Sequence, residues 1–125
     1  MKKNELVKLV ELDRKFQEDC ERVAEILKGI KDKGNYICFA HTFRIVDGDV
    51  YWEGDEWGSY QYHEEHDGFF PLEYLTMSNE ELEKIVEERN TELQKENEKK
   101  EKQKNAWDRK AKLELYEKLK KELGI

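Results

Sequence analysis

The first third of the chain spaces its apolar residues as a helix does. Between residues 6 and 30 apolar positions recur at three- and four-residue steps, with charged residues between them. This spacing predicts an amphipathic helix over residues 4–33, with Asn4 as its N-cap and the Gly34-Asn35 pair as its end. The face expected to pack against the rest of the protein carries a seven-residue repeat of Leu9, Phe16, Val23 and Ile30.

At residue 36 the apolar period changes from helical spacing to two. Alternation over residues 36–46 predicts a strand, the Asp47-Gly48-Asp49 sequence predicts a turn, and residues 50–53 return as a second strand. Gly54-Asp55 is interpreted as another turn, and residues 57–62 permit a third strand. Residues 63–68 are interpreted as a polar loop. The predicted sheet is therefore small, with two or three antiparallel strands.

A second, longer helix is predicted for the C-terminal part of the chain. Pro71, the only proline, limits residues 69–75 to an edge strand or one helical turn. Ser78 and Glu81 match a capping box at the start of a helix over 79–123. Residues 94–105 contain no apolar residue, so we expect a solvated helix or a fraying hinge there. The apolar face then resumes with Trp107, Ala111, Leu115, Leu119 and Leu123.

These elements predict an α+β fold in a single domain. Residues 1–93 are expected to form its compact part, with the first helix packed on one side of the sheet. Residues 94–125 are expected to form a charged helical extension of the same domain. This extension either projects from the core or mediates helix–helix association, and we favour a homodimer through the helices.

Composition supports a small core and a cytosolic protein. Only 37% of the 125 residues are apolar and 42% are charged, whereas ordinary domains have roughly 45–50% and 25%. The sequence has no signal-peptide pattern and no run near the ~20 apolar residues that a membrane span needs. We therefore expect no membrane association and a location in the cytosol. Cys20 and Cys38 are expected to be free, buried thiols.

The net charge of −7 is distributed unevenly. Residues 36–83 contain one arginine, no lysine and twelve acids, a net charge of −11, whereas the flanking segments are slightly positive. Such a segment attracts basic partners. It is unsuited to direct nucleic-acid binding, because phosphate contacts require lysine and arginine. The charge pattern therefore predicts a protein partner with a basic surface.

The sequence contains no convincing catalytic motif. The string His63-Glu64-Glu65-His66-Asp67 offers metal-ligand types, but it does not match the zincin spacing and is interpreted as a solvated loop. The many carboxylates have no spacing that selects an acid–base pair. Neither cysteine has a neighbouring base, and no glycine pattern matches a phosphate-binding loop. We predict no catalytic residues, no metal, no cofactor and no enzymatic activity.

An acidic segment rich in aromatic residues is the candidate binding site. Tryptophan and tyrosine are the usual anchors of protein interfaces, and carboxylates suit the polar rim. In the alternative interpretation, the aromatic rings pack the sheet against the helices and the acids keep the other face solvated. The predicted partner-binding residues are Trp52, Glu53, Asp55, Glu56, Trp57, Tyr60, Glu64 and Glu65.

Residues 70–75 (FPLEYL), Met77-Ser78 and residues 80–88 (EELEKIVEE) carry a resemblance to a group of known proteins. Over roughly residues 36–90 the chain resembles small phage and prophage proteins of Gram-positive bacteria. The resemblance implies a phage accessory protein, a setting in which short acidic proteins inhibit host defences, as the anti-CRISPR and anti-restriction classes do. It implies no catalytic residues. The long lysine-rich tail departs from the compact members of those classes and argues against pure DNA mimicry.

The function favoured by these observations is binding and inhibition of a host defence protein, for example a CRISPR effector or a restriction nuclease. The alternative is a structural or scaffolding protein that acts through its helices in a phage or bacterial cytosolic assembly. A small metal-dependent enzyme is the third candidate. A deep pocket converging on His41, His63 or His66 would favour that third candidate.

Overall fold

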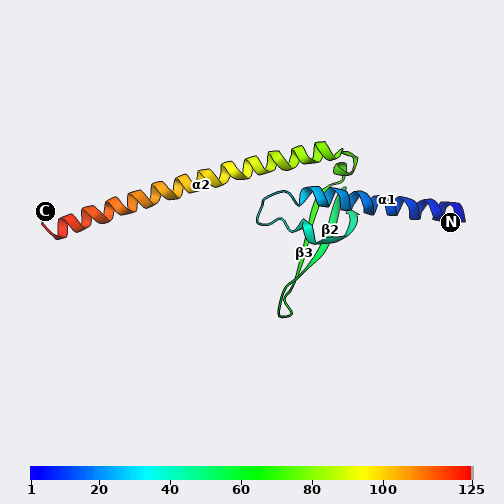
Figure 1. Ribbon diagram of the computed structural model, residues 1–125, viewed down its shortest axis with the longest axis horizontal. Coiled ribbons are helices and arrows are strands. Elements are labelled where there is room, and N and C mark those ends of the chain that lie inside the picture. Colours follow the sequence, from blue (N-terminus) through cyan, green and yellow to red (C-terminus); the bar gives the residue numbers. More distant parts are fainter. Residues whose placement is uncertain (125) are drawn as a thin grey trace. The chain divides into compact units, whose positions relative to one another are not determined.

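The computed structural model describes residues 1–124 and has the α+β fold that the sequence predicts. Within these residues the chain forms two long helices, α1 (Lys3–Leu27) and α2 (Asn79–Glu122), and three strands, β1 (Ala40–Val46), β2 (Asp49–Trp57) and β3 (His63–Pro71). Short 3₁₀ helices η1 (Ile37–Phe39) and η2 (Leu72–Thr76) lie before and after the sheet. The sheet is antiparallel, in the order β1-β2-β3 (Figure 1).

The chain divides into two compact units. Residues 1–90 form the first unit, and the second begins at Thr91, so α2 contributes to both. The first unit holds the core, where α1 covers one face of the sheet. The buried residues come from α1, η1, all three strands and the first turn of α2: Cys20, Val23, Ala24, Leu27, Ile37, Phe43, Val50, Trp52, Phe70 and Leu82.

Helix α1 is shorter than predicted and ends at Leu27. Its end is stabilised by side-chain amides from later in the chain. Asn35 donates to the carbonyl oxygens of Leu27 and Ile30, both at 3.0 Å, and Asn90 donates to that of Gly29 at 3.0 Å. These bonds satisfy carbonyl groups that a longer helix would have paired internally. The prediction of a helix to residue 33 is therefore wrong, because tertiary contacts end it first.

The predicted packing face of α1 is correct only in part. Val23 is fully buried and Phe16 is half-buried against the core, but Leu9 is half exposed and Ile30 lies beyond the helix. The helix also begins with Lys2, and not Asn4, at the N-cap position. The seven-residue repeat therefore identifies the buried face only where the sheet lies beneath the helix.

The β2–β3 hairpin is longer than predicted, and it extends away from α1 (Figure 1). Gly54 lies within β2 and is not a turn residue, and residues 63–68, expected to be a loop, belong to β3. The predicted third strand over 57–62 is mostly the connecting turn. The first strand begins at Ala40, not at residue 36, because η1 precedes it.

Two glycines in the hairpin are required by close contacts and not by turns. A Cβ atom on Gly54 would lie 2.2 Å from the Phe39 carbonyl oxygen, and one on Gly68 would lie 2.8 Å from the Trp52 indole. Both distances are shorter than side-chain carbon atoms tolerate. Glycine at these positions lets η1 and the Trp52 ring pack directly on the strands.

The other sequence predictions have mixed outcomes. The Ser78 hydroxyl accepts a hydrogen bond from the Glu81 amide at 3.2 Å, which confirms Ser78 as the cap of α2. Residues 94–105 continue that helix without a break.

Both cysteines are free, but Cys38 is exposed. Burial, with Asp19 and Glu21 nearby, raises the pKa of Cys20 to about 12. Within residues 1–124, neither helix has an apolar stretch long enough to span a bilayer.

Candidate functional site

The register of the β2–β3 hairpin places carboxylates directly opposite one another. Three of the four sets of partners between Glu53 and Glu56 are acid–acid pairs: Glu53 with Asp67, Asp55 with Glu65, and Glu56 with Glu64. Like charges in this position destabilise a sheet. Arg44 forms an ion pair with one of these six carboxylates, at 3.6 Å from Glu53. The hairpin therefore carries a concentrated and largely uncompensated negative charge.

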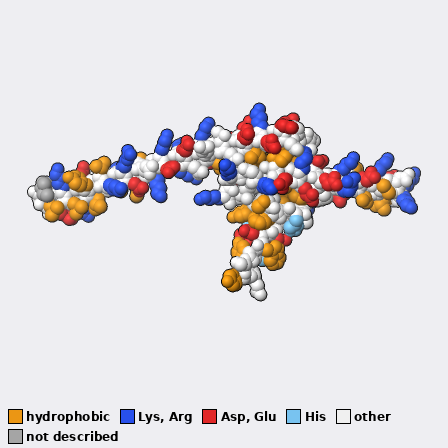
Figure 2. Space-filling model, in the orientation of Figure 1, with side chains coloured by type: hydrophobic (Ala, Val, Ile, Leu, Met, Phe, Trp, Pro, Cys, Tyr) orange, Lys and Arg blue, Asp and Glu red, His pale blue; other side chains and the backbone are white. Residues whose placement is uncertain are grey.

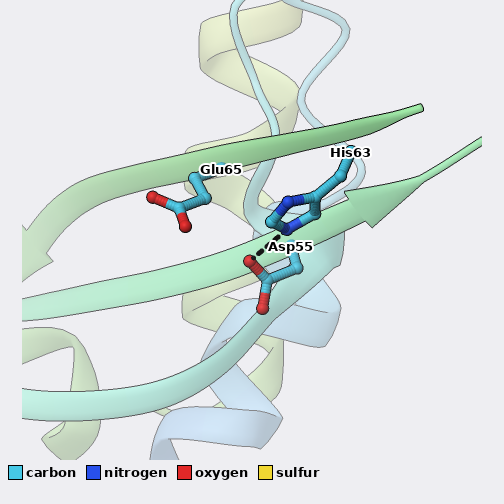
Figure 3. Close-up of side chains that lie close together, drawn as sticks. All are labelled: Asp55, His63 and Glu65. Atoms are coloured by element: carbon cyan, nitrogen blue, oxygen red, sulfur yellow. Dashed lines mark hydrogen bonds and ion pairs between the residues drawn. The ribbon is translucent and has the colours of Figure 1, made fainter. Parts of the chain in front are cut away.

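Two histidines converge on one of these carboxylates from the neighbouring strands. The Nε2 atom of His41 in β1 lies 2.7 Å from one oxygen of Asp55, and that of His63 in β3 lies 3.0 Å from the other. Hydrogen bonds from His63 and His41 hold the pKa of the Asp55 carboxyl below its ordinary value. Figure 3 shows Asp55, His63 and Glu65, whose potential ligand atoms lie within 4.8 Å of one another.

This group lies on the face of the sheet that α1 does not cover. Alternation along the strands places Glu53, Asp55, Glu65 and Asp67 on that face, where they border an open groove of about 450 Å³. The Tyr51 hydroxyl also lies there and donates to Asp67 at 3.0 Å, which raises the pKa of Tyr51 to about 12. The groove is polar and acidic, so it is suited to a cation or a basic side chain and not to an apolar ligand.

A second cluster lies on the opposite face of the same hairpin. His66 Nε2 lies 2.8 Å from a Glu56 oxygen and 4.0 Å from a Glu64 oxygen. The His66 ring stacks on Tyr36 with a centroid distance of 3.8 Å, and its side chain is only 7% exposed. His66 therefore contacts the Glu56/Glu64 pair from the core side and joins the hairpin to the segment before η1.

The turn that connects β2 and β3 presents aromatic rings to solvent. The exposed fractions are 73% for Trp57 and 101% for Tyr60, and Tyr62 is about half exposed. Figure 2 shows apolar side chains at this free end of the hairpin. Trp57 stacks on His63 at 4.1 Å, and the Tyr62 hydroxyl donates to Glu64, which raises the pKa of Tyr62 to about 12. Tyrosine and tryptophan rings are enriched in protein interfaces, where polar groups form the rim.

The turn also holds two residues in a rare backbone conformation. Tyr60 and Gln61 have φ angles of +59° and +62°, and the turn closes through a bond from the Tyr62 amide to the Ser59 carbonyl at 3.4 Å. Two consecutive positive φ angles are typical of a type I′ turn, which favours Asn-Gly. Side chains without that preference are retained here at a local cost in stability.

The chain was compared with family models, curated proteins and solved structures. None of them matches it.

All eight predicted partner-binding residues lie on this hairpin, but not on one face. Glu53, Asp55 and Glu65 share the uncovered face, Glu56 and Glu64 lie on the other, and Trp57 and Tyr60 lie at the free end. Trp52 is 6% exposed and belongs to the core, so its predicted role as a surface anchor is wrong. For this residue the alternative interpretation, packing of the sheet, is correct.

Sequence reasoning missed the roles of His41, His63 and His66 as partners of the acids. The missed signal is the alternation in His63-Glu64-Glu65-His66-Asp67. In a strand, this alternation places His63 and Glu65 on one face of the sheet and Glu64 and His66 on the other. The polar composition of this string favoured a loop. Its pairing with β2 could not be inferred from polarity alone.

Proposed function

We propose that this protein is a phage-type accessory protein that binds and inhibits a host defence protein in the cytosol, for example a CRISPR effector or a restriction nuclease. The binding surface in this proposal is the free half of the β2–β3 hairpin, residues 53–67, which holds the three acid–acid pairs and the turn. The observation that carries the proposal is the set of three opposed carboxylate pairs beside exposed aromatic rings. A fold gains nothing from such pairs, whereas a basic partner surface compensates them on binding.

In this proposal the acidic and the aromatic side chains of the hairpin have different roles in binding. Residues 49–71 hold seven acids and neither lysine nor arginine, so they attract a basic surface over several ångströms. Trp57, Tyr60 and Tyr62 then provide apolar contact area once the partner is bound. In this proposal the protein acts by occupying its partner's basic surface and has no catalytic activity.

The turn offers a variant that separates stability from binding. Replacing Tyr60 by asparagine and Gln61 by glycine gives a sequence suited to the observed φ angles, so we expect the free energy of unfolding to rise by about 1 kcal/mol. The same variant removes the Tyr60 ring and should weaken partner binding by about 2 kcal/mol, roughly thirtyfold. Denaturant unfolding and pull-down from a Gram-positive host lysate with mass spectrometry measure the two effects.

The matched control is Gln61→Gly alone, which relieves one strained residue and keeps the Tyr60 ring. It should be more stable than the parent and retain the same captured protein. If the double variant captures that protein as well as the control does, the turn is not the contact surface and the proposal fails.

A second candidate function, helix-mediated assembly, is favoured by the C-terminal part of α2. Trp107, Leu115, Leu119 and Leu123 recur at four- or eight-residue steps, and all are exposed. Exposed apolar rows of this kind are usually covered by another helix. We propose that a second copy of the chain covers them, since residues 84–125 mix lysine and glutamate and carry a net charge of only +3.

Sedimentation equilibrium tests this assembly directly. The parent should have twice the mass of the chain, and Leu115→Gln with Leu119→Gln should shift it to the monomer, because the substitutions remove the apolar contact. Lys118→Gln, in the same helical turn, should leave the dimer intact. A parent protein that remains a monomer at every concentration would exclude the homodimer.

A further inference from the structure

The uncovered face of the hairpin gathers metal-ligand side chains from all three strands. His41 comes from β1, Asp55 from β2, and His63 and Glu65 from β3. Asp55 and Glu65 are direct cross-strand partners, and the two imidazoles contact different oxygens of the Asp55 carboxylate. The bulge between Ala40 and Thr42 shifts the register of β1 next to His41. Local backbone irregularity of this kind re-aims a side chain.

We propose that His41, Asp55, His63 and Glu65 form a binding site for one divalent transition-metal cation, with Zn²⁺ as the best-suited ion. Two imidazole nitrogens with two carboxylate oxygens form a donor set that Zn²⁺ accepts in tetrahedral geometry. This inference reverses the sequence-based prediction of no metal, which treated residues 63–68 as a loop.

Ligand atoms of Asp55, His63 and Glu65 lie within 4.8 Å of one another, and His41 contacts the other Asp55 oxygen, so the four side chains must close in on a shared cation. Ligand bonds of roughly 2.0–2.1 Å to a tetrahedral Zn²⁺ place neighbouring ligand atoms about 3.3 Å apart. The observed separations from Asp55 oxygens are 2.7 Å for His41 and 3.0 Å for His63, so a cation requires these pairs to open by about half an ångström. Trp57 stacks on the His63 ring at 4.1 Å and restricts its orientation, which reduces the entropy lost on binding.

The two other acid–acid pairs are less suited to a metal. Glu53 already pairs with Arg44, and Asp67 accepts the Tyr51 hydroxyl, with no imidazole in this set. Glu56 and Glu64 have a single imidazole, His66, whose stacked position on Tyr36 belongs to the core side. The pair completed by two histidines is therefore the one that a transition metal selects.

A cation at this position would do two things for the hairpin. It would compensate the Asp55/Glu65 repulsion, and it would join β1, β2 and β3 beyond the part of the sheet that α1 covers. Five of the seven acids in residues 49–71 remain unused by it, so the surface stays acidic. The metal site therefore does not depend on the proposed partner.

Calorimetric titration of the tag-free, chelator-treated full chain with ZnCl₂ tests the site. We expect one equivalent of Zn²⁺ to bind. The Asp55→Asn/Glu65→Gln variant should bind Zn²⁺ at least about tenfold more weakly, because two ligands lose their charge. The matched control, Glu53→Gln/Asp67→Asn, removes the same charge from the same face and should keep an affinity close to the parent's. Both variants replace side chains by isosteres and relieve a repulsive pair, so they should fold.

Imidazole ¹⁵N spectra of the parent identify the ligands. Stoichiometric Zn²⁺ should shift the His41 and His63 resonances and leave those of His66 in place. Three results would overturn the proposal: no binding at stoichiometric Zn²⁺, equal loss of affinity in the control and the site variant, or a shift confined to His66. Equal loss in the two variants would mean that the acidic face attracts cations only diffusely.

Discussion

Replacing Gly54 by alanine should destabilise the protein by about 3 kcal/mol or more, a large part of the stability of a domain with so small a core. The new Cβ atom would lie 2.2 Å from the Phe39 carbonyl oxygen and 2.9 Å from the Ala40 amide nitrogen. Both atoms are backbone, so no side chain can rotate away. Relief requires η1 and the start of β1 to move off the sheet. Thermal and urea unfolding, followed by circular dichroism, measure the loss.

The matched control is Gly34→Ala. A Cβ atom there would have only the Asp32 carboxylate within 4 Å, at 4.0 Å. Its unfolding free energy should stay within about 1 kcal/mol of the parent's, on the stabilising side if the unfolded chain loses freedom. If Gly54→Ala unfolds at the same urea concentration as Gly34→Ala, the close approach of η1 to β2 is wrong, and the register of β1 must be reconsidered.

Charge reversal on the hairpin should give the largest functional effect. Glu56→Lys with Glu64→Lys changes the hairpin charge by four units and leaves the proposed metal ligands unaltered. The association rate with a basic partner should fall at least about tenfold at low salt, because steering by opposite charges is lost. Near 1 M salt the difference should nearly vanish, since the Debye length is then about 3 Å. Stopped-flow or surface-based kinetics with the captured partner measure it.

The same pair provides an internal stability control. Glu64→Lys alone converts the Glu56/Glu64 opposition into an opposite-charge pair worth about 0.2–1 kcal/mol, but it removes the hydrogen bond from Tyr62. The unfolding free energy should therefore stay within about 1 kcal/mol of the parent's, while association still slows. The double variant restores a like-charge pair and also removes the His66–Glu56 hydrogen bond, so it should be less stable than Glu64→Lys alone. If both variants associate at the parent's rate at low salt, the acids of the hairpin do not attract the partner and serve only to keep the protein soluble.

The hairpin contains several features that oppose folding. Opposed carboxylates and left-handed Tyr60 and Gln61 each reduce stability locally. Strained and unfavourable local choices concentrate where a protein binds or reacts. Their concentration in the free half of one hairpin, while the covered half of the sheet is apolar, supports binding as the role of that free half.

Much of the fold could be predicted from the pattern of residues along the chain. Helical spacing located both long helices, the Ser78 cap located the start of α2, and the change to period two located β1. These signals are local, because backbone geometry requires a periodic apolar face wherever an element meets a core. The concentration of acids in residues 36–83 is likewise a property of the sequence alone.

Only the tertiary structure decided where the elements end and which side chains meet. Asn35 and Asn90 end α1 at Leu27 through bonds to carbonyl groups, although the apolar pattern continues to Ile30. Gly54 and Gly68 have the sequence signature of turns, yet they lie within strands because η1 and the Trp52 ring approach them. Pairing of β2 with β3 then determines that Asp55 faces Glu65, and that His41 and His63 reach the same carboxylate. Such contacts join residues that are far apart in the sequence. The register between two strands depends on both strands together, so the local sequence of either strand does not determine it.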